Sequence, residues 1–155
     1  MFKEAENSGL RFSCVQCGGC CTGSPGYVWL SEEDIQRLAD AFALSREVFI
    51  QTYCIAVDIG EGRAVSLSEK EGFDCILLVE GRCSAYEARP VQCRTYPFWE
   101  EIVSSETSWR EEAKHCPGIG KGFLHSPESI VQRILSRRAA GKYFLPDDDG
   151  EGGTL

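Results

Sequence analysis

The sequence predicts a small α+β fold in which about three or four helices and a short β-hairpin alternate with cysteine-rich loops. Three observations lead to this prediction. The chain has 155 residues, a length that suits one compact domain. Nine of these residues are cysteines, a high count for this length. Apolar residues recur at helical spacing in separate segments, whereas glycine surrounds the first cysteines and favours loops there.

The first clear helix is predicted over residues 30–42. Ser31 is a good N-cap, and Asp34 stands where a capping box needs an acceptor. The apolar residues that follow have the i, i+3, i+4, i+7 spacing of an amphipathic helix. A second helix is expected from the Ser45 cap to about Cys54.

Two short strands are predicted at residues 63–67 and 75–79, which are rich in β-branched and aliphatic side chains. The turn at residues 80–82 follows the second strand and leads directly to Cys83. This pattern predicts a hairpin that brings Cys75 and Cys83 close together on neighbouring strands.

Two prolines indicate further helices. Pro90 can begin a short helical turn that carries Cys93. Ser126 caps the last helix, Pro127 takes its first position, and Gly141 is the expected stop. The buried stripe of this helix is expected to consist of Ile130, Val131, Ile134 and Leu135.

All of these elements fit one domain over residues 1–145. The remaining residues, 146–155, are acidic and rich in glycine, and a disordered tail is expected there.

The charge of the chain bears on its partners. The formal net charge is −8, from 24 acidic and 16 basic side chains. Nucleic acids and anionic membranes bind basic surfaces, so neither partner is expected. The longest strongly aliphatic run, residues 76–79, is also far too short to cross a bilayer.

The amino terminus has neither the apolar segment nor the cleavage site of a secretory signal, so a cytoplasmic location is expected. A reducing cytoplasm keeps thiols reduced, and this many cysteines then favours metal ligation over disulfides. The alternative is a secreted disulfide scaffold whose leader has been removed.

The strongest motif is Cys14-x2-Cys17-x2-Cys20-Cys21. A CxxC pair places two sulfurs within reach of one ion, and the first three cysteines also match the start of the bacterial ferredoxin run. The fourth cysteine breaks that run because it follows Cys20 directly. Adjacent side chains tend to diverge, so the doublet indicates either two metal sites or one polynuclear site.

Four further cysteines complete a candidate set of about eight thiolate ligands, enough for two tetrahedral sites. These four are Cys75, Cys83, Cys93 and Cys116. Cys54 is expected to fill the core, with a ninth ligand or a redox thiol as the alternatives. The fold is therefore expected to be metal-stabilised, with its Cys-rich loops around a metal cluster.

A cluster of thiolates needs cations and polar groups around it. Arg89 and Arg94 lie close to Cys93 in the sequence and are expected to contact the cluster, or else to pair with surface carboxylates. Tyr96 is expected beside the ligands, where core packing is its default role and the alternatives are to shield the metal from water or to line a pocket. His115 is expected to be a polar neighbour rather than a replacement ligand.

Three segments resemble the YkgJ-type cysteine-cluster family, which is described as zinc- or iron-chelating. Residues 14–21 resemble its CxxCxxCC signature, and residues 83–98 resemble its C-x-x-Y-x-x-RP-x-x-CR-x-YP block. The closing Cys116-Pro117-Gly118 also fits the family pattern. The likeness covers residues 10–125.

The resemblance implies a metal-chelating domain of unassigned activity that binds zinc or an iron–sulfur cluster, including [4Fe–4S]. Metal ions are then the expected partners, and a protein partner is left open. A distant branch of the family is associated with flagellin lysine N-methylation. That branch implies the alternative of an iron–sulfur enzyme, an S-adenosylmethionine-dependent protein lysine N-methylase, and leaves open whether the chain is an enzyme.

Overall fold

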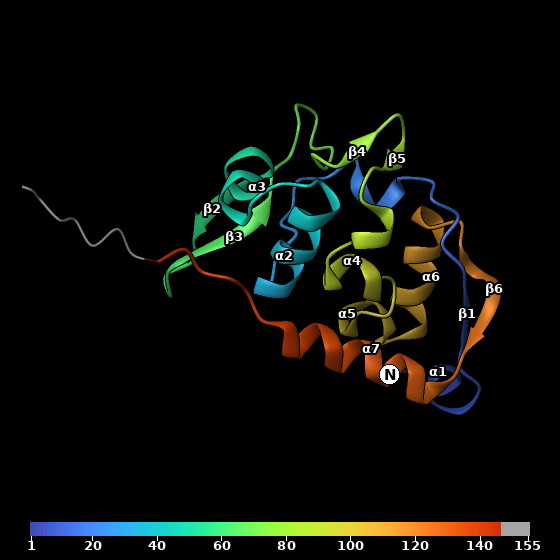
Figure 1. Ribbon diagram of the computed structural model, residues 1–155. Helices are drawn as coiled ribbons and strands as arrows, with labels where there is room; N and C mark the ends of the chain where they lie inside the picture. The colour runs from blue at the N-terminus through green and yellow to red at the C-terminus, as the bar shows by residue number, and fades with distance from the viewer. Residues whose placement is uncertain (147–155) are drawn as a thin grey trace, which may run out of the picture.

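The computed structural model describes residues 1–146 and confirms a small α+β fold (Figure 1). Within this part of the chain, four helices have eight or more residues, in agreement with the expected three or four. They are α2 (Glu32–Ala41), α3 (Arg46–Tyr53), α6 (Glu106–His115) and α7 (Pro127–Ala140). The shorter helical segments are α1 (Lys3–Asn7), η1 (Gly19–Cys21), η2 (Tyr86–Ala88), α4 (Val91–Thr95) and α5 (Glu100–Val103). The predicted tail, apart from Pro146, lies outside the described residues.

The predicted caps are present. The Ser31 hydroxyl accepts a hydrogen bond from the Asp34 amide at 3.1 Å, and Asp34 Oδ2 accepts one from the Ser31 amide at 3.2 Å. This reciprocal pair is a capping box and fixes the start of α2. Ser45 and Ser126 cap α3 and α7 through their hydroxyls alone, which accept from the amides of Val48 and Ser129.

The predicted stripe of α7 is partly wrong. Ile130 is fully buried and Ile134 is half-buried, but Val131 and Leu135 are 38% and 46% exposed. The reason is that α7 lies at the edge of the molecule (Figure 1), and only Ile130 of this helix is fully buried.

Three antiparallel pairs of strands make up the sheets. The pairs are β1 (Leu10–Phe12) with β6 (Ile119–His125), β2 (Cys54–Asp58) with β3 (Arg63–Leu67), and β4 (Leu78–Val79) with β5 (Arg82–Cys83). The last pair is the predicted hairpin, but Leu78 lies opposite Cys83, and Cys75 lies outside the strand, contrary to the prediction. Its first strand is shorter than predicted because the Leu78 amide bonds back to the carbonyl oxygen of Cys75 at 2.9 Å and forms a turn.

The buried side chains form two separate clusters, which we call the α6 core and the α2 core. The α6 core consists of Ala5, Leu10, Phe12, Phe98, Ile102, Val103, Trp109, Cys116, Ile119 and Ile130. The α2 core consists of Leu30, Ile35, Leu38, Ala39, Phe49, Val65, Leu67, Leu77, Ala85 and Ala88. The first cluster therefore unites segments far apart in the sequence, whereas the second is built from one continuous stretch.

The chain that follows α7 connects the two cores. It runs from the end of α7 to the β2–β3 hairpin (Figure 1). There the Tyr143 amide donates to the Leu30 carbonyl at 2.7 Å. The Tyr143 carbonyl accepts a hydrogen bond from the Val65 amide at 2.9 Å. Leu145 donates to the carbonyl of Arg63 at 2.9 Å. Residues 143–145 thus lie along β3 like a third strand.

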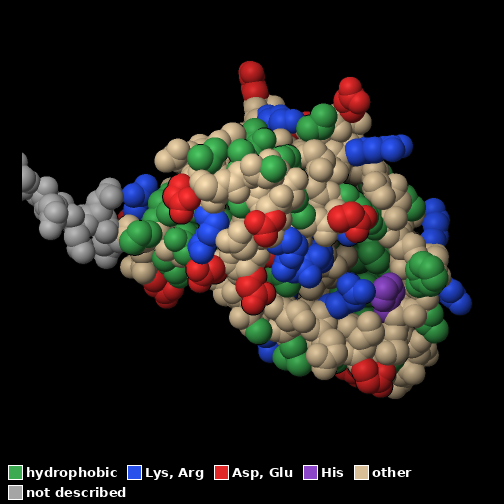
Figure 2. Space-filling view, viewed as in Figure 1, with side chains coloured by type: hydrophobic (Ala, Val, Ile, Leu, Met, Phe, Trp, Pro, Cys, Tyr) green, Lys and Arg blue, Asp and Glu red, His purple; other side chains and the backbone are tan. Residues whose placement is uncertain are grey.

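The surface in Figure 2 carries acidic and basic side chains next to one another, without a continuous basic stripe on that face. Among residues 1–146, no helix has the length and apolar character needed to cross a membrane.

Candidate metal centre

A cavity of about 60 Å³ lies between the two cores. Phe12 of the α6 core lines one side of it, and Leu67 and Leu77 of the α2 core line the other. All eight cysteines of the candidate ligand set line this same cavity, namely Cys14, Cys17, Cys20, Cys21, Cys75, Cys83, Cys93 and Cys116. Cys54 lies outside it, packed against the α2 core.

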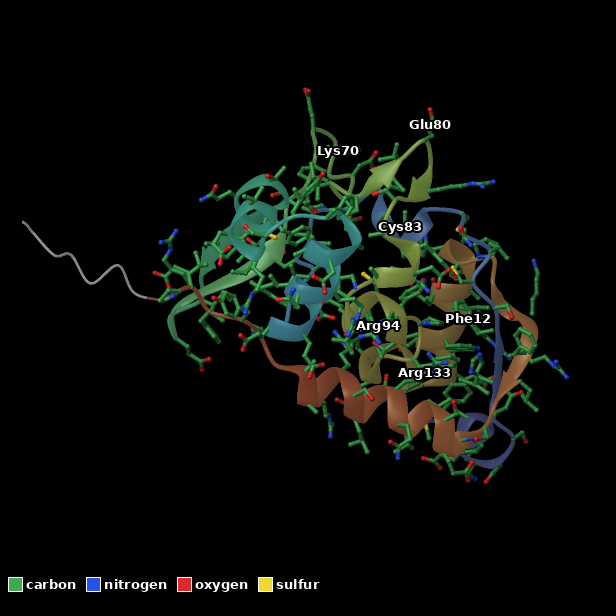
Figure 3. All side chains as sticks on the ribbon, viewed as in Figure 1. Phe12, Lys70, Glu80, Cys83, Arg94 and Arg133 are labelled. Atoms are coloured by element: carbon green, nitrogen blue, oxygen red, sulfur yellow. The ribbon has the colours of Figure 1, made fainter. Side chains whose placement is uncertain are left out.

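These cysteines reach the cavity from separate elements. Cys14 and Cys17 lie in the loop after β1, Cys20 and Cys21 form η1, and Cys75 precedes β4. Cys83 ends β5, between the hairpin and α4 in Figure 3, while Cys93 is on α4 and Cys116 follows α6.

The first cysteine loop is tied to the hairpin. Gly18 has φ +73°, and a Cβ atom there would lie 2.8 Å from the carbonyl oxygen of Gly81. Only glycine fits such a close approach with that backbone conformation. A hydrogen bond of 2.8 Å from the Cys75 amide to the carbonyl of Cys21 adds a second tie.

Five of the sulfurs share one hydrogen-bonding pattern. The amide two residues further along donates to the sulfur, at 3.4 Å from Gln16 to Cys14 and 3.5 Å from Gly19 to Cys17. The same backbone contact recurs at Cys75, Cys83 and Cys116. Backbone donors of this kind act to lower the pKa values of Cys75, Cys83 and Cys116. Thiolates are the form in which cysteine binds metals.

Cys20 and Cys21 do not diverge as expected from their adjacency. Their sulfur atoms lie 3.8 Å apart. Two thiolates on one tetrahedral zinc ion, each at about 2.3 Å, would be separated by about 3.8 Å as well. The hydrogen-bond contact between the two thiols lowers the pKa of Cys20 to about 7 and raises the pKa of Cys21.

Burial acts in the opposite direction and is the larger effect on four thiols, three of which have these backbone donors. It raises the pKa values of Cys75, Cys83, Cys93 and Cys116. A metal cation would offset this cost, because a coordinated thiol is deprotonated. A cation bound in the cavity would therefore lower the pKa values of these buried thiols and favour their thiolate forms.

The two arginines expected near the cluster occupy different places. Arg89 lines the cavity, its guanidinium 3.6 Å from the centroid of the Tyr86 ring. It also favours the thiolate forms of Cys83 and Cys93. Arg94 does not line the cavity and lies 3.6 Å from Asp34 Oδ1 instead. The structure thus brings only the first of the two to the cysteines.

Tyr96 and His115 both line the cavity. The Tyr96 hydroxyl donates to Glu112 Oε1 at 2.5 Å and also contacts the sulfur of Cys116. Burial, together with these acceptors, raises the pKa of Tyr96, so its hydroxyl stays protonated as a donor.

Two contributors were missed in the sequence. Tyr86 contacts Cys14 at the cavity wall. Asp34 is 1% exposed, and its Oδ1 accepts a 3.0 Å hydrogen bond from the Val91 amide, at the start of the helix that carries Cys93. The capping box revealed one role of this carboxylate, but the bond to residue 91 spans 57 positions and has no local signal.

A second cavity, of about 300 Å³, adjoins the first. Cys20, Cys21, Cys75 and Cys93 line both cavities. The other four cysteines line the first cavity alone. The eight thiols therefore divide into four that separate the two cavities and four on the far wall.

The sulfurs surround a hollow and do not yet meet at one point. In the part of the chain that the structure describes, no three Cys, His, Asp or Glu side chains are close enough to hold one ion. A bound group must therefore reach several walls, or the loops must move inward onto it. The donor set itself, all thiolate, fits zinc and iron–sulfur clusters.

The comparisons with known proteins agree with this chemistry. A family described as "CxxCxxCC: Putative zinc- or iron-chelating domain" matches residues 13–117, about two-thirds of the chain. The chain belongs to this CxxCxxCC family. The match confirms the resemblance inferred from the sequence and runs from the loop after β1 to the residue after Cys116.

Among curated proteins, the chain is similar to the uncharacterized protein MJ0939 of Methanocaldococcus jannaschii. It is 26% identical over 129 residues, which cover 78% of this chain and 41% of the relative. The chain thus spans less than half the length of this relative. No solved structure matches the chain.

Proposed function

We propose that the protein binds zinc or iron through the eight cavity cysteines, and that the resulting centre holds the two cores together. One observation carries the proposal: a single cavity between the cores collects all eight cysteines and leaves out Cys54. The ligands come from both sides, since Cys116 belongs to the α6 core while Cys75 and Cys83 pack on the α2 core.

The division of the cysteines between the two cavities supports a centre with two halves. One half would be Cys20, Cys21, Cys75 and Cys93, which line both cavities. Within this group, the thiolate of Cys21 is disfavoured by the charges of the other three, as expected for neighbouring sulfurs. Two zinc ions, or one [4Fe–4S] cluster with a further metal, would each suit four thiolates on each side.

Metal analysis of protein purified without oxygen tests the proposal. About two zinc per chain would support closed tetrahedral sites. About four iron with matching sulfide would support a cluster. The reducing cytoplasm expected from the sequence would keep the thiols free for either metal. A folded chain that carries neither metal and takes up neither on reconstitution would contradict the proposal.

The ligand set is tested with a matched pair of variants. Cys17→Ser removes a cavity thiol and is expected to lower the metal content, whereas Cys54→Ser, outside the cavity, is expected to leave it unchanged. Equal losses in both variants would show that the cavity does not define the ligands.

A second candidate is an iron–sulfur enzyme that uses S-adenosylmethionine in protein lysine N-methylation. The second cavity favours it, because a reactive centre needs an open side and space beside it for a substrate. Iron-loaded protein would then bind S-adenosylmethionine and transfer its methyl group to a lysine-containing peptide. A centre of two closed zinc sites would contradict this candidate.

A further inference from the structure

We infer that the second cavity binds a small organic cation directly beside the metal centre. The inference rests on the proposed function, because four of the residues that line this cavity are cysteines proposed as metal ligands. The volume of about 300 Å³ is at the lower end of the range found for small-molecule sites in proteins.

Aromatic rings form much of the wall. Tyr27, Phe73, Tyr96 and Trp99 all line the cavity, and they come from three separate segments of the chain. The rings of Tyr96 and Trp99 meet edge to face at 5.4 Å between centroids. Ring faces attract cations through their quadrupoles, most strongly when the site is shielded from water.

The charged groups in the wall have one sign. Glu69 and Glu112 line the cavity, and among its described lining residues there is no Lys, Arg or His. Both carboxylates are held in place, since Glu69 Oε1 accepts from the Gly26 amide at 2.9 Å and Glu112 Oε1 from Tyr96. Metal-bound thiolates would add negative charge to the same wall. An anionic ligand would be repelled there, and a cation would be attracted.

Two neighbouring cations do not neutralise this wall. Arg137 stacks on the ring of Trp99 at 4.3 Å, but it lies outside the lining and is paired with Glu101. Lys70 also lies outside the lining, and its ammonium donates to the carbonyl of Leu78.

Phe73 is held at the rim in a conformation that bulky residues rarely adopt. Its φ is +67°, and its side chain is 51% exposed. The turn is fixed by hydrogen bonds of 3.1 Å from the Phe73 amide to Lys70 and 2.7 Å from the Lys70 amide to Asp74. A left-handed backbone is unfavourable for a residue other than glycine. Residues with such strain are concentrated at active sites and ligand clamps.

The direct test compares two probes of nearly equal shape on the metal-loaded protein. Choline carries a quaternary ammonium, and 3,3-dimethylbutan-1-ol is its neutral counterpart. Choline is expected to bind at least about tenfold more tightly in titration calorimetry, because only its charge meets the rings and carboxylates. It is also expected to shift the absorption bands of a cobalt- or iron-loaded centre. Equal affinity for the two probes, or no binding of either, would overturn the inference.

Isosteric variants locate the site. Glu69→Gln and Glu112→Gln keep the acceptor oxygens but remove the charge, and each is expected to weaken choline binding about fivefold. Glu71→Gln, on the same loop as Glu69 but outside the lining, is the control. Phe73→Leu is expected to weaken binding by about threefold, with Phe123→Leu on β6 as its control. If the control variants weaken binding as much as their partners, the cavity is not the site.

Metal content measured on the same samples separates the two proposals. If the metal-loaded protein does not bind choline, the proposed cation site is overturned and the proposed metal centre is not. Protein that contains no metal and binds no choline overturns both.

Discussion

The α2 core and the α6 core differ in how the chain assembles them. The α2 core comes from residues 30–88, where helices, a hairpin and short loops bring neighbours together. The α6 core joins residues from Ala5 to Ile130, and its β1–β6 pair sets Leu10 opposite His125. Closing so long a loop costs more chain entropy than closing a hairpin.

The proposed metal centre lies where that long loop closes. Cys14 and Cys17 follow β1 directly, and Cys116 precedes β6. Metal bound between these cysteines would join the two ends of the loop, as a cross-link does. The comparison therefore predicts that the α6 core depends on the metal more than the α2 core does.

Metal removal should produce the largest effect. Structural zinc contributes on the order of 10–16 kcal/mol to a small domain, comparable with the total stability of most domains. After complete chelation, hydrogen exchange followed by mass spectrometry should show loss of protection first in β1 and β6, and later in α2. Unchanged circular dichroism after complete metal removal, or equal loss of protection in both cores, would contradict this prediction.

Asp34→Asn should have a smaller effect, because it weakens one link between the two regions. The buried carboxylate joins α2 to the start of α4 and lies beside Arg37 and Arg94. Loss of its charge should lower the free energy of unfolding of the loaded protein by about 2 kcal/mol, measured by chemical denaturation. Metal content should stay constant. Asp40→Asn, on the exposed side of α2, is the control and should change stability little.

The smallest effect on folding stability is expected from the thiol of Cys54, which packs against the α2 core. Burial raises its pKa to about 12, so the thiol is neutral at pH 8. In the loaded protein its alkylation by iodoacetamide should be about a thousandfold slower than in the unfolded chain and rise about tenfold per pH unit. Peptide mapping by mass spectrometry measures both rates. Folding stability from this buried thiol is complete below pH 9.0, its unfolded pKa, and is lost as the pH rises toward 12. Rapid alkylation of Cys54 at pH 8 would contradict its placement.

The parts of the fold that the sequence predicts are those with local signals. The N-caps Ser31, Ser45 and Ser126 bind amides three residues further along, so each helix start can be recognised locally. The turn before Cys83 likewise predicts its hairpin. β1 and β6 carry no such signal. Three residues pair with a glycine-containing segment more than 100 positions away, and only the completed core makes them strands.

The candidate site divides in the same way. Spacing singled out Cys14, Cys17, Cys20 and Cys21, and the count of thiols needed for two tetrahedral sites added the other four cavity cysteines. The sequence did not show that Arg89, and not Arg94, lies beside the cysteines. Arg94 is paired instead with Asp34, which belongs to another helix. Nor did the sequence reveal the second cavity, whose rings come from three segments.

The placement of residues 143–145 along β3 has a consequence for synthesis on the ribosome. Seven of the eight cavity cysteines emerge before Cys116, and even the locally built α2 core lacks its covering segment until Leu145 has been made. The growing chain therefore presents reactive thiols long before the cavity between its cores can close around them. Synthesis has to pass Cys116, and not only the first CxxC, before all eight cavity cysteines are present.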